Sequence, residues 1–460
     1  MKKAGTFFFF LIFILIKAGA QAPAFQVRFS EPLAVFEFVD YLSANAPDNP
    51  YKTLFNNSKF NQQQYKRLVA AYDKLNTDYE YEYTAYPYGQ KIGGSTQSLL
   101  KKCLINSTSI NDLKLKALGI IPNTDLFKLV DILNAFEPVY QELMYQPNKA
   151  VFEQQLQALK TLIVSKNIAS YFMMGEKFYN SSWDNTIPFQ LVFYPLPGTK
   201  HFTATAFYNN AVSALPVGFT NYNKLLSVML HETFHILYDE QSLAFKQDIE
   251  KWFTSNPSKN GRYAFLLMNE ALATSLGNGY VYGQLNGKED TAEWYHRKYT
   301  NLMAKKIYPM VKEYASLQKP IDKAFVDNYI KIYDGNFSGW LLEPDNIMTD
   351  RYIIADNPDA FNSIDQKFAY RSMSQYDAGI TLVNIEKLKM APITKVVIVS
   401  KDNKNSLQLV KSQFKELADW NPDSGIDFNY VAWVNSDKTY LVIINVVKQK
   451  VEGHLDALRF

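Results

Sequence analysis

Helical spacing dominates the pattern of apolar and polar residues in the first part of the chain. Apolar side chains recur three and four residues apart, which predicts amphipathic helices at residues 31–44, 61–76, 125–145 and 152–166. The third helix has Thr124 as a candidate N-cap and should end near Pro147, because proline removes a backbone hydrogen bond. We therefore expect a mostly helical N-terminal region at residues 21–185.

Extended runs follow this helical region. Residues 189–194, 202–208 and 211–217 are apolar or alternating segments that precede a strongly apolar helix, and they predict a small sheet beside it. The stretch 211–215 is a candidate exposed edge that could align an extended peptide by strand addition. An ordinary structural strand explains this stretch equally well.

The pattern of apolar residues changes again near the C-terminus. A helical pattern continues through residues 304–384, with a turn near 334–339. From residue 394 the runs KVVIVS, FNYVAWV and TYLVIINVV predict strands, with a helix at 406–420 and a hairpin across 435–437. We expect an α+β, predominantly helical fold, with a central region at 186–390 and a small α+β lobe at 391–460.

The most informative helix is predicted at residues 225–239, LLSVMLHETFHILYD. It is apolar on nearly every side, which places it at the centre of a domain, with Thr220 or Asn221 as its N-cap. His231 and His235 are one turn apart, so both imidazoles can reach one metal ion, as Zn²⁺ requires. Glu232 is rotated about 100° from His231 and can take a proton beside that ion.

Chance is a poor explanation of this spacing. An H-E-x-x-H arrangement should arise by accident roughly 0.003 times in a chain of this composition. A pair of hydrogen-bonded core histidines remains the alternative interpretation, although histidine is uncommon among so many apolar residues.

A second apolar helix is predicted at residues 263–276, stopped by Gly277 and Gly279. Glu270 interrupts its apolar pattern. A buried carboxylate is costly unless it is paired or bound to a metal, so Glu270 is a candidate third zinc ligand. An ion pair with Arg262 or Lys251 is the alternative.

The two motifs together resemble a known family. H-E-x-x-H on one helix and N-E-x-x-A on a later one are similar to the pattern of gluzincin metallopeptidases within the zincins. The matching residues are His231, Glu232, His235, Asn269, Glu270 and Ala273. The resemblance covers about residues 220–280 and implies a zincin-like core with His231, His235 and Glu270 as zinc ligands and Glu232 as the general base.

One departure from the family pattern concerns the residue that orients a ligand histidine. Thermolysin-like members have an aspartate four residues after the ligand glutamate, where this chain has Thr274, so Asp239 is a candidate replacement. The resemblance also implies a downstream His or Tyr that stabilises the oxyanion, and His296 and Tyr295 are the candidates.

The first twenty residues have the three regions of a signal peptide. Lys2 and Lys3 precede an apolar run at 6–16, and small residues at 18–20 suit cleavage before Gln21. Removing this leader removes three lysines and no acid, so the formal net charge of +3 becomes 3 − 3 = 0. We expect an exported chain, periplasmic or secreted, with no membrane span after cleavage and no nucleic-acid partner.

These observations predict an exported zinc-dependent metallopeptidase that acts on a peptide or protein substrate. Glu232 would deprotonate water activated by Zn²⁺, and that water would attack the peptide carbonyl. A zinc hydrolase of a non-peptide amide or ester would use the same residues. A non-catalytic envelope binding protein is the third hypothesis. The intact Glu232 argues against it. A structural zinc site would also ordinarily have four protein ligands and no open position.

Overall fold

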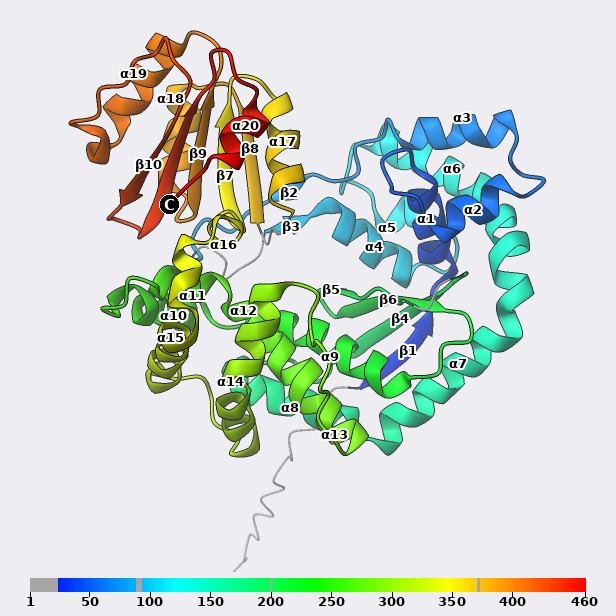
Figure 1. Ribbon diagram of the computed structural model, residues 1–460. Helices are drawn as coiled ribbons and strands as arrows, with labels where there is room; N and C mark the ends of the chain where they lie inside the picture. Colours follow the sequence, from blue (N-terminus) through cyan, green and yellow to red (C-terminus); the bar gives the residue numbers. More distant parts are fainter. Residues whose placement is uncertain (1–23, 88–92, 199–200, 370–372) are drawn as a thin grey trace, which may run out of the picture.

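The computed structural model describes residues 24–87, 93–198, 201–369 and 373–460 (Figure 1). Helices outnumber strands, and the strands form two larger sheets and one short pair, so the α+β, predominantly helical fold is confirmed. The expected leader and its cleavage site lie outside the described residues. Within those residues, no helix combines the length and the apolar character needed to cross a membrane.

The N-terminal helices pack around an apolar core of their own. All four predicted helices are confirmed, and Ser30 caps the first because its hydroxyl accepts a hydrogen bond from the amide of Leu33 at 3.3 Å. The elements are α1 (Glu31–Leu42), α2 (Pro50–Asn56), α3 (Gln63–Tyr72), β2 (Glu80–Tyr81), β3 (Gly94–Ser95), α4 (Thr96–Asn106), α5 (Leu113–Lys116), α6 (Asn123–Tyr140) and α7 (Gln146–Ser165).

The ends of α6 differ from the prediction. Its N-cap is Pro122, so Thr124 lies inside the helix. A π-helical turn, η1 (Gln141–Tyr145), joins α6 directly to α7, and the chain does not leave the helix near Pro147. The hydrogen-bond ladder shifts at this turn, so the missing amide hydrogen of Pro147 falls where the regular pattern is already interrupted.

A four-stranded sheet separates the N-terminal helices from the central body. Its order is β1-β4-β6-β5, with β1 (Phe25–Phe29), β4 (Phe189–Leu196) and β6 (Asn210–Pro216) parallel and β5 (Thr205–Phe207) antiparallel to β6. Alternate residues of β4 enter different cores. Val192 and Tyr194 face the N-terminal helices, whereas Leu191 and Phe193 face the central body. The sheet therefore has two buried faces.

The predicted edge strand is wrong. β6 lies between β4 and β5, so residues 211–215 form an internal structural strand, which was the alternative interpretation, and the outer strands are β1 and β5. The reason is the tight connection after Phe207, which folds β5 back onto β6 and pairs Thr205 with Val212. Beyond β5, the amide of Ala214 donates to Thr203 Oγ1 at 3.3 Å.

The central body is helical and surrounds α9 (Tyr222–Asp239), which corresponds to the most informative helix of the sequence (Figure 1). The side chain of Asn221, one of the two predicted caps, accepts a hydrogen bond from the amide of Lys224 at 3.2 Å. The other elements are α8 (Ile168–Tyr179), α10 (Leu243–Ser255), α11 (Gly261–Leu266), α12 (Met268–Ala273), the π-helix η2 (Thr274–Val281), α13 (Tyr282–Asn286), α14 (Lys298–Ser316), α15 (Lys323–Phe337), η3 (Ser338–Leu342) and α16 (Pro344–Ile347).

The C-terminal lobe begins earlier than residue 391. Its five-stranded sheet has the order β10-β11-β9-β7-β8, in which only the β10–β11 pair, the predicted hairpin, is antiparallel. Helices α17 and α20 cover one face, and α18 and α19 cover the other. The elements are β7 (Asp350–Ala355), α17 (Asp359–Lys367), β8 (Met373–Ala378), α18 (Leu382–Met390), β9 (Thr394–Val399), α19 (Asn403–Gln413), η4 (Lys415–Leu417), β10 (Phe428–Val434), β11 (Thr439–Asn445) and α20 (Val451–Asp456).

The two added strands, β7 and β8, correct the expectation that residues 304–384 are helical apart from a turn near 334–339. β7 is buried along its whole length, but its sequence, DRYIIA, begins with two charged residues and has an apolar run of only four. A short apolar run does not distinguish a buried strand from a helix. The lobe therefore takes in residues from Asp350 onward.

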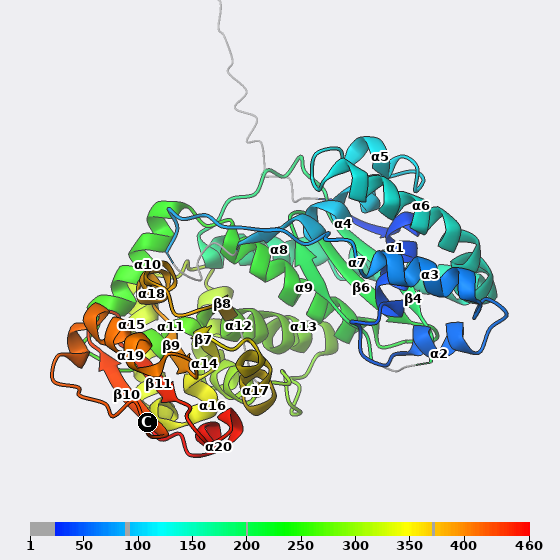
Figure 2. The same cartoon turned by 90° about the horizontal axis from the view of Figure 1, so that it is seen from above.

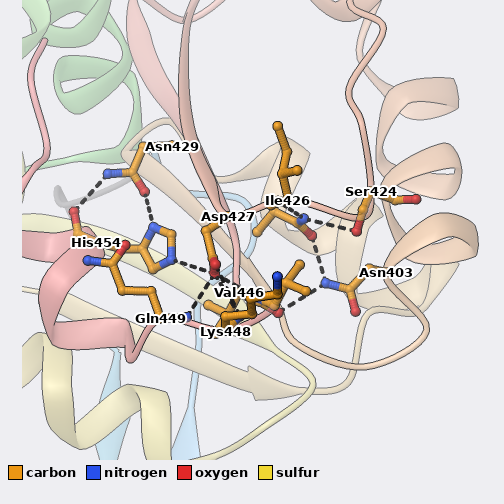
Figure 3. A network of polar contacts seen from close by, with 11 residues as sticks. Asn403, Ser424, Ile426, Asp427, Asn429, Val446, Lys448, Gln449 and His454 are labelled. Atoms are coloured by element: carbon orange, nitrogen blue, oxygen red, sulfur yellow. Dashed lines mark hydrogen bonds and ion pairs between the residues drawn. The ribbon is translucent and has the colours of Figure 1, made fainter.

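Hydrogen bonds connect the elements of this lobe to one another and connect the lobe to the central body. The Asp427 carboxylate accepts from the amide of Lys448 at 3.0 Å and contacts His454 Nε2 at 3.3 Å (Figure 3). At the junction, Arg262 Nε donates to the carbonyl of Pro392 at 2.8 Å, and Lys438 Nζ donates to that of Asn256 at 3.2 Å. Figure 2 shows the lobe and the N-terminal helices on opposite sides of the body.

Candidate metal centre

Helix α9 brings the two histidines together. Their Nε2 atoms are 3.1 Å apart, and the rings meet edge to face with centroids 4.8 Å apart. His231 is buried, and Glu232, the next residue, has its Oε1 atom 4.0 Å from His231 Nε2. The one-turn spacing therefore produces the convergence that the sequence predicts.

Helix α12 brings Glu270 to the same point. Its Oε1 atom is 3.5 Å from His235 Nε2, and its Oε2 atom is 3.8 Å from His231 Nε2. Arg262, the alternative partner, has its Nη1 atom 3.8 Å from Glu250 and donates to a backbone carbonyl. In the described part of the chain, His231, His235 and Glu270 are the one set of three such ligand residues, with ligand atoms within 4.8 Å of one another.

These distances fit a tetrahedral metal. With zinc–nitrogen distances of about 2.0–2.1 Å, two ligand atoms of a tetrahedral site lie about 3.3 Å apart, close to the 3.1, 3.5 and 3.8 Å of this cluster. Glu270 Oε2 is buried and has no hydrogen-bond donor among the described residues. A carboxylate oxygen in this situation is stabilised by a cation, so the donor set suits Zn²⁺.

The two histidines are oriented by different means. The Nδ1 atom of His235 is 2.8 Å from Asn269 Oδ1, and because an amide oxygen accepts, Nδ1 carries the proton and Nε2 is left free for a metal. Asp239, the predicted orienting group, instead lies 3.9 Å from Lys246 Nζ. His231 has the backbone of Ala273 as a hydrogen-bonding neighbour, and its Nδ1 makes no side-chain hydrogen bond among the described residues.

Burial and neighbouring charge shift the ionisation of all four groups. Burial, together with His235, lowers the pKa of His231 to about 3. Burial raises the pKa of Glu232 to about 7. Burial alone would lower the pKa of His235 and raise that of Glu270, but their mutual attraction outweighs it, so the His235 pKa is raised and the Glu270 pKa is lowered. The neutral His231 ring is the form that binds a metal.

Of the two predicted oxyanion donors, Tyr295 lies at the cluster. Its ring stacks on that of His231, with centroids 5.9 Å apart, and its hydroxyl helps to lower the pKa of Glu270. His296 is exposed, and its ring stacks on the ring of Tyr295, with centroids 4.5 Å apart. Tyr295 is therefore the better placed of the two.

Gly277 and Gly279 do not stop the second helix. The chain stays helical from Gly261 to Asn286, broken only at Leu267, and the helix ends at Gly287, which has a positive φ of 71°. The two glycines lie inside η2, where the backbone passes close to other parts of the molecule. The helical pattern that continues beyond them, with buried Val281 and Leu285, is the signal that could have identified this.

Two roles at this centre were missed by sequence reasoning. The hydrogen bond from His235 to Asn269 was not predicted, although Asn269 belongs to the N-E-x-x-A motif. The contact of Gly277 with His231 was also missed.

Comparison of the chain with protein-family models, curated proteins and solved structures finds no significant match.

Proposed function

We propose that the chain is a zinc-dependent metallopeptidase that is exported from the cell. The observation that carries this proposal is the convergence of His231, His235 and Glu270 on one point, with Glu232 beside them. His231, His235 and Glu270 would hold the ion, which supplies a Lewis acid toward water and a substrate carbonyl when bound.

Glu232 is proposed as the general base. It is adjacent to a ligand without belonging to the set of three, so its carboxylate is available to accept a proton from the attacking water. The water oxygen adds to the peptide carbonyl carbon, and the proton taken by Glu232 then passes to the leaving amine nitrogen as the C–N bond breaks. The Tyr295 hydroxyl would donate to the oxygen that becomes negatively charged.

The number of ligands supports catalysis over a structural role. A structural zinc site is ordinarily closed by four protein ligands, whereas a catalytic site has three and leaves one position open. The set in the described residues has three members. This favours a hydrolase over the non-catalytic binding protein. Whether the substrate is a peptide or a non-peptide amide or ester is decided by a direct test of activity.

The test combines metal analysis with substrate profiling. Purified protein is incubated with a peptide library, with and without a chelator, and cleavage is followed by mass spectrometry. Glu232→Gln should keep zinc near one equivalent, since Glu232 is not a ligand, while turnover falls by roughly 10²–10⁴-fold. Near wild-type turnover in this variant rules out Glu232 as the base. If the protein cleaves esters but not peptides, the function is that of a non-peptide hydrolase.

A further inference from the structure

The π-helix η2 contacts the back of the candidate ligand His231. A Cβ atom added at Gly277 would lie 2.6 Å from the Cβ of His231, 2.8 Å from its Cα and 2.9 Å from its backbone nitrogen. Two of these three atoms belong to the backbone of α9, which cannot move without moving the histidine. Only glycine therefore allows η2 to lie this close to the ligand.

The same π-helix also holds the residue next to Tyr295. Asn278 Nδ2 donates to the carbonyl of Trp294 at 2.7 Å, and a Cβ atom at Gly279 would lie 2.8 Å from the Trp294 ring. Trp294 directly precedes Tyr295 in the sequence, and the Tyr295 ring stacks on that of His231. Consecutive residues of η2 thus contact His231 directly and, through Trp294, from a second direction.

This double contact is important because no side chain orients His231 in the way that Asn269 orients His235. His235 is held by a hydrogen bond to Asn269, whereas the hydrogen-bonding neighbour of His231 is the backbone of Ala273, the residue that directly precedes η2. The orientation of His231 therefore depends on the backbone packed beside it. The wide turn of a π-helix is found frequently at functional sites, and here it supplies the packing surface.

We propose that η2 is the positioning element of this metal centre, with Gly277 setting His231 directly and Asn278 setting it through Trp294 and Tyr295. The inference rests on the proposed metal centre but not on the proposed peptidase activity. It predicts that small changes in η2 weaken metal binding even though none of its residues is a ligand.

The experiment uses Co²⁺ as the probe on the full-length mature protein after removal of metal by a chelator. Affinity and the visible absorption spectrum are measured on protein that is folded by circular dichroism. Gly277→Ala should weaken Co²⁺ binding by about 10–100-fold and alter the spectrum, as losing an orienting group does in other metal sites. Asn278→Ala, a truncation that adds no atoms, should weaken it by a smaller factor.

Two matched variants separate positioning from stability. Gly175 of α8 packs closely on two apolar side chains of α9 that are not candidate ligands, because its added Cβ would lie 2.6 Å from the Phe234 ring and 2.9 Å from the Leu237 side chain. Gly175→Ala should lower the thermal midpoint without changing Co²⁺ affinity. Asn286→Ala, which removes a hydrogen bond to the Tyr282 carbonyl in the same helical run, is the control for Asn278→Ala.

Each outcome decides between the hypotheses. Wild-type affinity in folded Gly277→Ala and Asn278→Ala overturns the inference, and if Gly277→Ala does not fold, wild-type affinity in Asn278→Ala alone overturns it. Failure of the wild-type protein to take up Co²⁺ overturns the metal centre and this inference together. Weakened binding in the η2 variants of a protein without peptidase activity leaves the inference standing and removes only the proposed function.

Discussion

The two helices that supply the candidate ligands are built in different ways. α9 is a regular helix of 18 residues with a side-chain cap, and its two histidines are one turn apart. The run from α11 through α12 and η2 to α13 is broken at Leu267 and widened into a π-helix that contains Gly277 and Gly279. α9 depends on its own sequence, whereas the second helix acquires its shape from what it touches.

The strongest test of this comparison is the ligand on the second helix. Glu270→Ala leaves two histidines and removes the anionic ligand, so zinc affinity should fall by well over the 10–100-fold expected from losing an orienting group. Metal content is measured by atomic emission on folded protein, beside the thermal midpoint. Glu289→Ala, which removes an ion pair to Lys312 away from the centre, is the control.

The opposite result has a distinct form. If Glu270 is only the partner of a buried ion pair, Glu270→Ala should destabilise the fold by about 3–5 kcal/mol and leave stoichiometric zinc on the folded fraction. The ligand assignment and the resemblance to gluzincins would then both fail.

The loop held by the second helix provides the next test. Tyr295→Phe removes the hydroxyl beside Glu270 and keeps the ring that stacks on His231, so turnover should fall by about 10²–10³-fold, as when one oxyanion donor is removed. His296→Ala, at the exposed neighbour, should have a much smaller effect. Steady-state kinetics on both variants decide which residue acts, and a larger loss in His296→Ala would reverse the assignment.

The contrast between the helices also explains what could be predicted from the sequence. The H-E-x-x-H spacing and its cap are local features, and α9 was predicted almost to its ends. Gly277 and Gly279 have the sequence signature of a helix end, and only the apolar spacing beyond them indicates that the helix continues. The widening into a π-helix could not be predicted, because it goes with the close contacts of the two glycines with His231 and Trp294.

The same distinction applies to the sheets. The position of β6 inside its sheet depends on which strand folds back onto it. The apolar run within β7 is only four residues long and too short to separate from a helix. In the four-stranded sheet, β4, β5 and β6 were predicted correctly, since alternation and breaks are local, whereas β1 was not predicted. Strand order is a tertiary property and was not predicted.

The hydrogen bond between Asn269 and His235 allows the two histidines to be compared directly. Asn269→Ala removes the acceptor at 2.8 Å from His235 Nδ1 and should weaken zinc binding by about 10–100-fold. The affinity is measured by competition with a chromogenic chelator. Asn260→Ala, in the loop before α11, is the matched amide truncation, and an equal loss there would indicate general destabilisation.

The smallest effect is expected at the start of α9, where the helix depends least on its surroundings. Asn221→Ala removes the side-chain oxygen that accepts from the Lys224 amide and should lower the free energy of unfolding by about 1 kcal/mol. Because His231 lies more than two turns further along the helix, metal affinity should not change. Ser242→Ala removes the equivalent cap of α10, at 3.2 Å from the Phe245 amide, and should cost a similar amount. Denaturant unfolding and chelator competition are measured on the same preparations. A loss of metal affinity in Asn221→Ala alone would mean that the histidines depend on the whole of α9, and the contrast between a self-sufficient helix and one shaped by its contacts would no longer hold.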